Sequence, residues 1–277
     1  MTIPSENATS EPSLIALRSE IDRLDDALLA LLLERADVVA RLAASRSKGA
    51  GPPLRPGREA LILRRLLDRH QGPLPRAAMV RLWREIFASS TLMQGSFSVA
   101  GHVRAPEQER ILRDHFGGQT PVKLHPSATA ALAAVSGGRT SLAVLPLPEE
   151  AEPADAAWWT RLESPRLQVV ARLPFYAEGE PGPEMLAVAA VPPDATGADR
   201  SLLRLEFMRQ QSRASVTQAL VAAGLVPRSL QLRSDAGMTR VLVEVDGALA
   251  ADDPRLVGLP FDRATPLGFY AVPERGE

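Results

Sequence analysis

The sequence predicts a multi-domain protein in which an all-α three-helix N-terminal domain precedes an α+β region with a small parallel sheet and a ferredoxin-like unit. Three observations predict this fold class. Residues 13–47 contain neither proline nor glycine, residues 97–147 alternate short apolar strands with helical stretches, and residues 202–272 follow a β-α-β-β-α-β order. The length of 277 residues fits about two domains at roughly 150 residues per domain.

The first helix carries an apolar seam of the heptad kind. Its members alternate at spacings of four and three: Leu17, Ile21, Leu24, Leu28, Leu31, Val38 and Leu42. Ser13 is the expected N-cap, and Gly49 follows the helix. A helix about 50 Å long is wider than a compact domain of this size. We therefore expect it to pack against another subunit in an intertwined homodimer.

Two shorter helices are expected at 57–70 and 75–94, and the chain after Gly95 changes character. Strands at 97–100, 122–125 and 141–147 enclose helices at 107–116 and 128–135, which favours a parallel sheet. Residues 148–165 are expected to form a loop, which is followed by strands at 167–173 and 185–191. Residues 192–200 are expected to form a linker to the ferredoxin-like unit. That unit has strands at 202–208, 228–232, 239–245 and 269–272, a helix at 215–223 and a helical turn near 253–257.

Composition narrows the function classes. The chain is 45% hydrophobic and 23% charged with a net charge of −1, which excludes a disordered protein and argues against nucleic acid or an anionic membrane as partner. The absence of cysteine excludes disulfides, thiolate metal sites and a cysteine nucleophile. Residues 1–12 are expected to be disordered and lack the pattern of a signal peptide. We expect a cytoplasmic protein.

Polar side chains interrupt the apolar faces of all three helices. Arg35 stands in the seam, and Arg46 shares its face about 16 Å further on. Arg58 and Glu59 open the second helix, while Ser90 and Gln94 lie one turn apart in the third. Singly, each fits an interhelical ion pair, a snorkelling side chain or a satisfied polar core residue. Together they suit the binding of a small dicarboxylate.

These residues carry a resemblance to the all-helical chorismate mutases, helix for helix over about 80 residues. The family positions hold Arg18, Arg35, Arg46, Arg58 with Glu59, and Ser90 with Gln94. The chain departs from the family twice. Arg46 stands where relatives have lysine, with Lys48 out of phase, and Arg55 stands where some relatives have aspartate.

The resemblance implies a Claisen rearrangement of chorismate to prephenate in phenylalanine and tyrosine biosynthesis, without metal or cofactor. It implies catalytic roles for Arg46 and Gln94 at the ether oxygen and for Glu59 at the C4 hydroxyl. It implies substrate binding through the carboxylates by Arg18, Arg35, Arg58 and Ser90. Arg18 lies about 25 Å along the helix from Arg35, so a shared site must take Arg18 from the partner subunit. The four histidines show no metal-ligand spacing.

The C-terminal region resembles part of prephenate dehydratase followed by the end of an ACT domain, through SVAGHVRAPEQERILRDHFGG and TRVLVEVDGALAADDPRL. The catalytic Thr-Arg-Phe motif and the Glu-Ser-Arg-Pro motif of that family are absent. We therefore expect domains at 13–96 (chorismate mutase), 97–195 (a degenerate dehydratase-like α/β region) and 196–277 (ACT-like). A bifunctional mutase–dehydratase and a non-catalytic amino-acid-sensing protein remain alternatives.

Overall fold

The computed structural model describes residues 13–45, 53–150, 152–180, 182–208, 211–235 and 237–276. The chain divides into two units, residues 1–48 and residues 49–277, and each unit is described by itself. The segment 1–12 that was expected to be disordered lies outside the described residues, as do Arg46 and Lys48.

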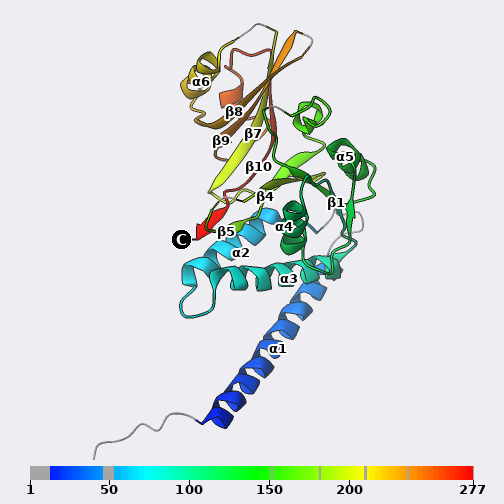
Figure 1. The fold of residues 1–277 in the computed structure, drawn as a ribbon, viewed down its shortest axis with the longest axis vertical. Coiled ribbons are helices and arrows are strands. Elements are labelled where there is room, and N and C mark those ends of the chain that lie inside the picture. Colours follow the sequence, from blue (N-terminus) through cyan, green and yellow to red (C-terminus); the bar gives the residue numbers. More distant parts are fainter. Residues whose placement is uncertain are drawn as a thin grey trace, which may run out of the picture. The chain divides into compact units, whose positions relative to one another are not determined.

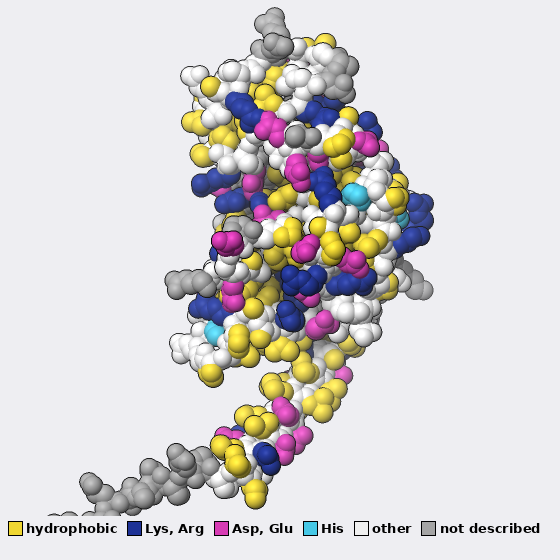
Figure 2. All heavy atoms as spheres, viewed as in Figure 1, with side chains coloured by type: hydrophobic (Ala, Val, Ile, Leu, Met, Phe, Trp, Pro, Cys, Tyr) yellow, Lys and Arg dark blue, Asp and Glu magenta, His cyan; other side chains and the backbone are white. Residues whose placement is uncertain are grey.

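Helix α1 (Leu14–Ser45) forms the first unit with 32 residues, a length of about 48 Å. The hydroxyl of Ser13 accepts a hydrogen bond from the Ala16 amide at 3.2 Å, as expected of an N-cap. Every residue of the predicted seam is exposed, from 41% for Leu17 to 63% for Leu31. Figure 2 shows hydrophobic side chains along this helix. The single chain therefore presents a long apolar surface on α1.

Helices α2 (Pro56–Arg69) and α3 (Arg76–Gln94) begin the second unit, close to their predicted bounds. They do not form a core of their own: Leu63 and Phe87 pack in one cluster with Phe175 and Ala271. Arg64 of α2 adds hydrogen bonds to the Val272 carbonyl and the Glu274 carboxylate, each at 2.7 Å. These two helices are therefore part of the same folded body as the α+β region.

That region is built on one nine-stranded sheet of order β2-β1-β3-β6-β4-β10-β7-β9-β8 (Figure 1). The strands are β1 (Val99–Gly101), β2 (Val122–Leu124), β3 (Leu142–Pro146), β4 (Gln168–Leu173), β6 (Met185–Ala189), β7 (Asp199–Phe207), β8 (Pro227–Asp235), β9 (Met238–Asp246) and β10 (Arg263–Ala271). The predicted parallel pairing of the first three strands is confirmed. The last four strands are antiparallel, and helix α6 (Arg213–Ala222) and the short turn η2 (Pro254–Leu256) complete the ferredoxin-like order.

The parallel strands and the ferredoxin-like unit belong to one continuous sheet, because β6 and β4 lie between them. The predicted linker 192–200 runs into β7, which begins at Asp199. Three short elements were not predicted. They are η1 (Trp158–Arg161) within the expected loop, and β5 (Tyr176–Glu178) and β11 (Glu274–Gly276), which pair in a second sheet.

Helices cover both faces of the sheet. Helix α5 (Ala128–Ser136) packs with Trp158 and Trp159 on one face, and α4 (Pro106–Phe116) packs on the other. Covering both faces explains why β3 is apolar along its whole length. Helix α6 covers one face of the ferredoxin-like unit through Val216 and Leu220. Among the described helices, none combines the length and apolar character needed to cross a bilayer.

A half-buried arginine, Arg172, links the two parts of the sheet. Arg172 of β4 donates to the Glu244 carboxylate at 2.9 Å and to the Tyr270 hydroxyl at 3.0 Å. Tyr270 in turn donates to Glu244. Because Glu244 and Tyr270 belong to β9 and β10, these bonds supplement the short backbone contact between β4 and β10.

Gly268 occupies that contact, where β10 pairs with Val169 of β4. Its φ is +119°, and an added Cβ would collide with the Val169 backbone. We expect Gly268→Ala to lower the free energy of unfolding by about 2–4 kcal/mol, measured by urea denaturation. Gly258→Ala is the matched control, because a Cβ added at Gly258 would meet no atom within 4 Å. Equal stability of the two variants would contradict this account of the strand joint.

Candidate active site

Arg58 and Glu59, in the first turn of α2, differ in exposure to solvent. Arg58 is exposed, whereas the Glu59 carboxylate forms an ion pair of 2.8 Å with Arg84 of α3. The side chains of Glu59 and Arg84 are 19% and 6% exposed. Burial raises the pKa of Glu59, against the attraction of Arg84. Burial likewise lowers the pKa of Arg84. Glu59 is therefore held by a buried arginine.

Sequence reasoning missed Arg84. The residue stands within the apolar stripe of α3, between Trp83 and Phe87. A charge in such a stripe is a signal for a buried partner. That partner lies on another helix, so no local spacing in the sequence identifies it.

Ser90 and Gln94 lie near the end of α3, and their side chains bond to the helix backbone. The Ser90 hydroxyl donates to the Ile86 carbonyl at 2.6 Å, and the Gln94 amide donates to the Ser90 carbonyl at 3.0 Å. Ser90 is buried and Gln94 is half-buried. The packing of α2 on α3 brings the first turn of α2 and this polar pair into one folded unit.

The arginines of α1 belong to the other unit. Arg18 is exposed and Arg35 is half-buried, about 25 Å apart along the helix. The structure therefore places both arginines on one helix, in a unit described separately from the one that holds Glu59, Ser90 and Gln94.

Arg55, which stands where some relatives have aspartate, has a structural partner. Its Nε donates to Asp194 at 2.9 Å. Gly57 packs so closely on the Asp194 backbone that a side chain at this position would collide with it. The segment before β7 therefore fixes the start of α2, and with it the position of Glu59 one turn later.

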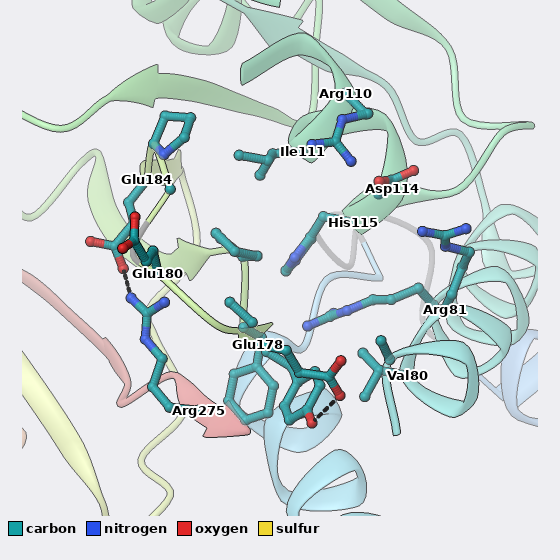
Figure 3. Close-up of a pocket in the computed structure, with 18 residues that line it drawn as sticks. Val80, Arg81, Arg110, Ile111, Asp114, His115, Glu178, Glu180, Glu184 and Arg275 are labelled. Atoms are coloured by element: carbon teal, nitrogen blue, oxygen red, sulfur yellow. Dashed lines mark hydrogen bonds and ion pairs between the residues drawn. The ribbon is translucent and has the colours of Figure 1, made fainter. Parts of the chain in front are cut away.

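A cavity of about 320 Å³ lies beside the Glu59–Arg84 ion pair. Arg84 and His115 are among the residues that line it. Figure 3 shows Arg81, Arg110 and Asp114 on the helical side and Glu180, Glu184 and Arg275 opposite. Glu184 and Arg275 pair at 3.0 Å. Arg81, Arg110 and Glu180 have no hydrogen bond or ion pair within the described part of the chain. The cavity thus offers charges of both signs.

Burial lowers the pKa of His115 well below its usual value, and the positive charge of Arg84 lowers it further. The unfolded chain binds a proton at this imidazole near pH 6.5, whereas the folded protein does not until lower pH. We expect the unfolding free energy to fall as pH falls below about 6.5, with a slope of at most about 1.4 kcal/mol per pH unit from this group. His115→Gln should remove that slope in denaturation series at several pH values. Identical slopes for both proteins would contradict a neutral His115.

Within the described residues, His, Asp and Glu side chains form no group of three or more that could hold a metal ion.

Comparison with known proteins identifies the helical region. Residues 17–95 match the family model of chorismate mutase type II, which confirms the predicted resemblance. The chain is 36% identical over 92 residues to the bifunctional chorismate mutase/prephenate dehydratase of Neisseria gonorrhoeae, covering 33% of this chain and 25% of that protein. It is 33% identical over 148 residues to the protein of that name from Stutzerimonas stutzeri, covering 50% and 40%.

The second match is longer than the helical region, so it continues into the α+β region, as the predicted layout requires. The chain covers less than half the length of both relatives. Among solved structures, the prephenate dehydratase of Arthrobacter aurescens in complex with L-Phe aligns with a TM-score of 0.48 at 14% identity, over 62% of this chain and 89% of that one.

Proposed function

We propose that this protein is a chorismate mutase that converts chorismate to prephenate by a Claisen rearrangement in phenylalanine and tyrosine biosynthesis. The observation that carries the proposal is the family match over residues 17–95, which spans all the polar positions predicted from the three helices. The protein acts in the cytoplasm on a small molecule, with no nucleic-acid or membrane partner.

The proposed chemistry needs binding and charge stabilisation rather than a covalent intermediate. Arg18, Arg35, Arg58 and Ser90 hold the two carboxylates. Arg46 and Gln94 donate to the ether oxygen as negative charge develops on it. Glu59 accepts from the C4 hydroxyl. No step in this rearrangement requires a metal or a cofactor.

The ion pair with Arg84 supports the role of Glu59. Arg84 binds Oε2 of the carboxylate, so Oε1 can accept from a substrate hydroxyl. The attraction of Arg84 favours the ionised form that can accept this bond, although burial acts against it. Arg84 is thus a positioning residue for Glu59 in the proposed site.

The exposed seam of α1 supports the homodimer. Twelve large apolar residues of this helix are exposed: Leu14, Ile15, Leu17, Ile21, Leu24, Leu28, Leu29, Leu31, Leu32, Leu33, Val38 and Leu42. Packing on the α1 helix of a second copy would remove this surface from water and bring Arg18 into the partner's site. The dimer therefore shares each site between subunits.

The domain boundaries remain proposals: a mutase domain at 13–96, a degenerate dehydratase-like region at 97–195 and an ACT-like domain at 196–277. Helices α2 and α3 share one hydrophobic core with the later residues Phe175 and Ala271. Cutting the chain after residue 96 would expose that core, so the experiments use the full chain.

Loss of chorismate absorbance in the presence of full-length protein tests the proposal. We expect turnover without added metal or cofactor, and unchanged turnover after treatment with a chelator. Formation of phenylpyruvate from prephenate would instead establish the bifunctional alternative. Absence of turnover by a folded dimer would overturn the proposed function.

One observation favours the sensing alternative as a second candidate function. The cavity of Figure 3 has Arg81 and Arg110 on one side and Glu180, Glu184 and Arg275 on the other, and its lining includes the apolar residues Phe175 and Ile111. A zwitterionic amino acid requires both signs of charge. A rise in melting temperature with phenylalanine or tyrosine, lost in Arg110→Ala, together with no chorismate turnover, would support this candidate.

A further inference from the structure

A row of charged side chains crosses the ferredoxin-like part of the sheet. Arg233 lies opposite Arg240, Arg240 opposite Glu206, and Glu206 opposite Arg263, from β8 to β10. Residues that lie opposite in neighbouring strands share a face, and like charges in such positions destabilise a sheet. Arg240 donates to Glu206 at 3.1 Å, but no acidic residue stands between Arg240 and Arg233 in this row. The row therefore carries three positive charges against one negative charge.

A fourth arginine lies on the same face. Arg204, two residues before Glu206, is 6% exposed. Its NH1 donates to the carbonyls of Trp159, Thr160 and Leu162 at 3.1–3.2 Å. Its Nε is buried without a hydrogen-bond partner, and the nearest carboxylate oxygen, on Glu206, is 3.7 Å away.

One carboxylate and two further arginines act on the charge of Arg204. Burial lowers the pKa of Arg204, Glu206 raises it, and the charges of Arg263 and Arg240 lower it further. Glu206 is thus the one carboxylate in this row, and it lies between Arg240 and Arg263. This leaves a positive charge that an anion from solution could neutralise.

The segment around η1 closes a cavity of about 160 Å³ over this row. It is lined by Ala154, Thr160, Arg161, Arg233 and Arg240, with no acidic side chain among these described residues. Arg161 is exposed and has no hydrogen bond or ion pair within the described part of the chain. Arg233 uses NH1 to donate to the Glu152 carbonyl at 2.8 Å. Its remaining donors, and those of Arg240 beyond Nε, make no hydrogen bond to any other described residue.

Three guanidinium groups from η1, β8 and β9 thus converge on a space that would hold about five water molecules at roughly 30 Å³ each. Guanidinium forks match the oxygens of phosphate and carboxylate groups in geometry and charge. We propose that this cavity binds a compact polyvalent oxyanion, a phosphate group or a small dicarboxylate. The bound anion would link η1 to the sheet, and its site is separate from the predicted mutase residues.

Calorimetric titration of the full-length protein with inorganic phosphate and with malonate, at constant ionic strength in chloride, tests this site. We expect at least one of the two anions to bind at about one per chain. We expect Arg161→Gln and Arg240→Gln each to weaken that binding by about tenfold or more. Tighter binding of phosphate would indicate a phosphate ligand, and tighter binding of malonate a dicarboxylate.

Arg228→Gln is the matched control. It removes the same charge from β8, but Arg228 pairs with Asp246 at the surface, outside the cavity. This variant should bind the anion within about twofold of the unaltered protein. Arg161 is exposed and has no partner to lose among the described residues, so Arg161→Gln should fold normally. Failure of both anions to bind, or equal weakening by Arg228→Gln and Arg161→Gln, would overturn the proposal.

Discussion

Replacing Arg35 with alanine is expected to lower kcat/KM for chorismate by about 30- to 1,000-fold, equivalent to about 2–4 kcal/mol of transition-state stabilisation. The proposed reaction separates charge within a substrate that carries two carboxylates. A guanidinium that holds one carboxylate both binds the substrate and keeps it in the reactive conformation. Truncation to alanine removes all of these charge-assisted hydrogen bonds.

Arg41→Ala is the matched control for Arg35→Ala. Arg41 lies on the same helix, is exposed, and is not among the predicted site residues. Its removal should leave kcat/KM within about twofold. Steady-state kinetics would be compared for both variants after sedimentation has confirmed the same oligomeric state. Near-normal turnover by Arg35→Ala would reject the role assigned to Arg35.

Much of the fold follows from local patterns in the sequence. The positions of glycine and proline predicted the three N-terminal helices. Apolar runs predicted the parallel strands β1–β3 and the order of the last four strands. Local patterns could not predict that all nine strands form one continuous sheet. This continuity depends on β6, on the contact of Gly268 with Val169, and on the Arg172–Glu244 bond between residues 72 positions apart.

The same distinction applies to the candidate site. Spacing along one helix gave the pairs Arg58 with Glu59 and Ser90 with Gln94. It could not give the Glu59–Arg84 ion pair, because its partners lie on two helices and meet only when α2 packs on α3. Nor could it give the tie between Arg55 and Asp194, which are 139 positions apart. Long-range ion pairs need the assembled fold, whereas helix faces need only the period of 3.6 residues.

Mixing inactive Arg18→Ala chains with inactive Arg35→Ala chains is expected to restore about a quarter of the unaltered activity. One straight helix separates Arg18 from Arg35 by about 25 Å, and an arginine side chain reaches only about 7 Å. Both can serve one chorismate only if they come from different subunits. The exposed seam of α1 gives the surface along which two such helices could pack antiparallel.

In a mixed dimer of this kind, one site carries both substitutions and the other carries neither. Random exchange of subunits makes half of the dimers mixed, and each mixed dimer has one intact site of two, which gives the expected quarter. Differently tagged chains would allow the mixed dimer to be purified and assayed directly, with the expectation of about half the unaltered activity per dimer. If Arg18 is only a solvated surface charge, Arg18→Ala alone stays active and mixing adds nothing. If the purified mixed dimer recovers no activity while both parents are folded and inactive, the site is not shared between subunits.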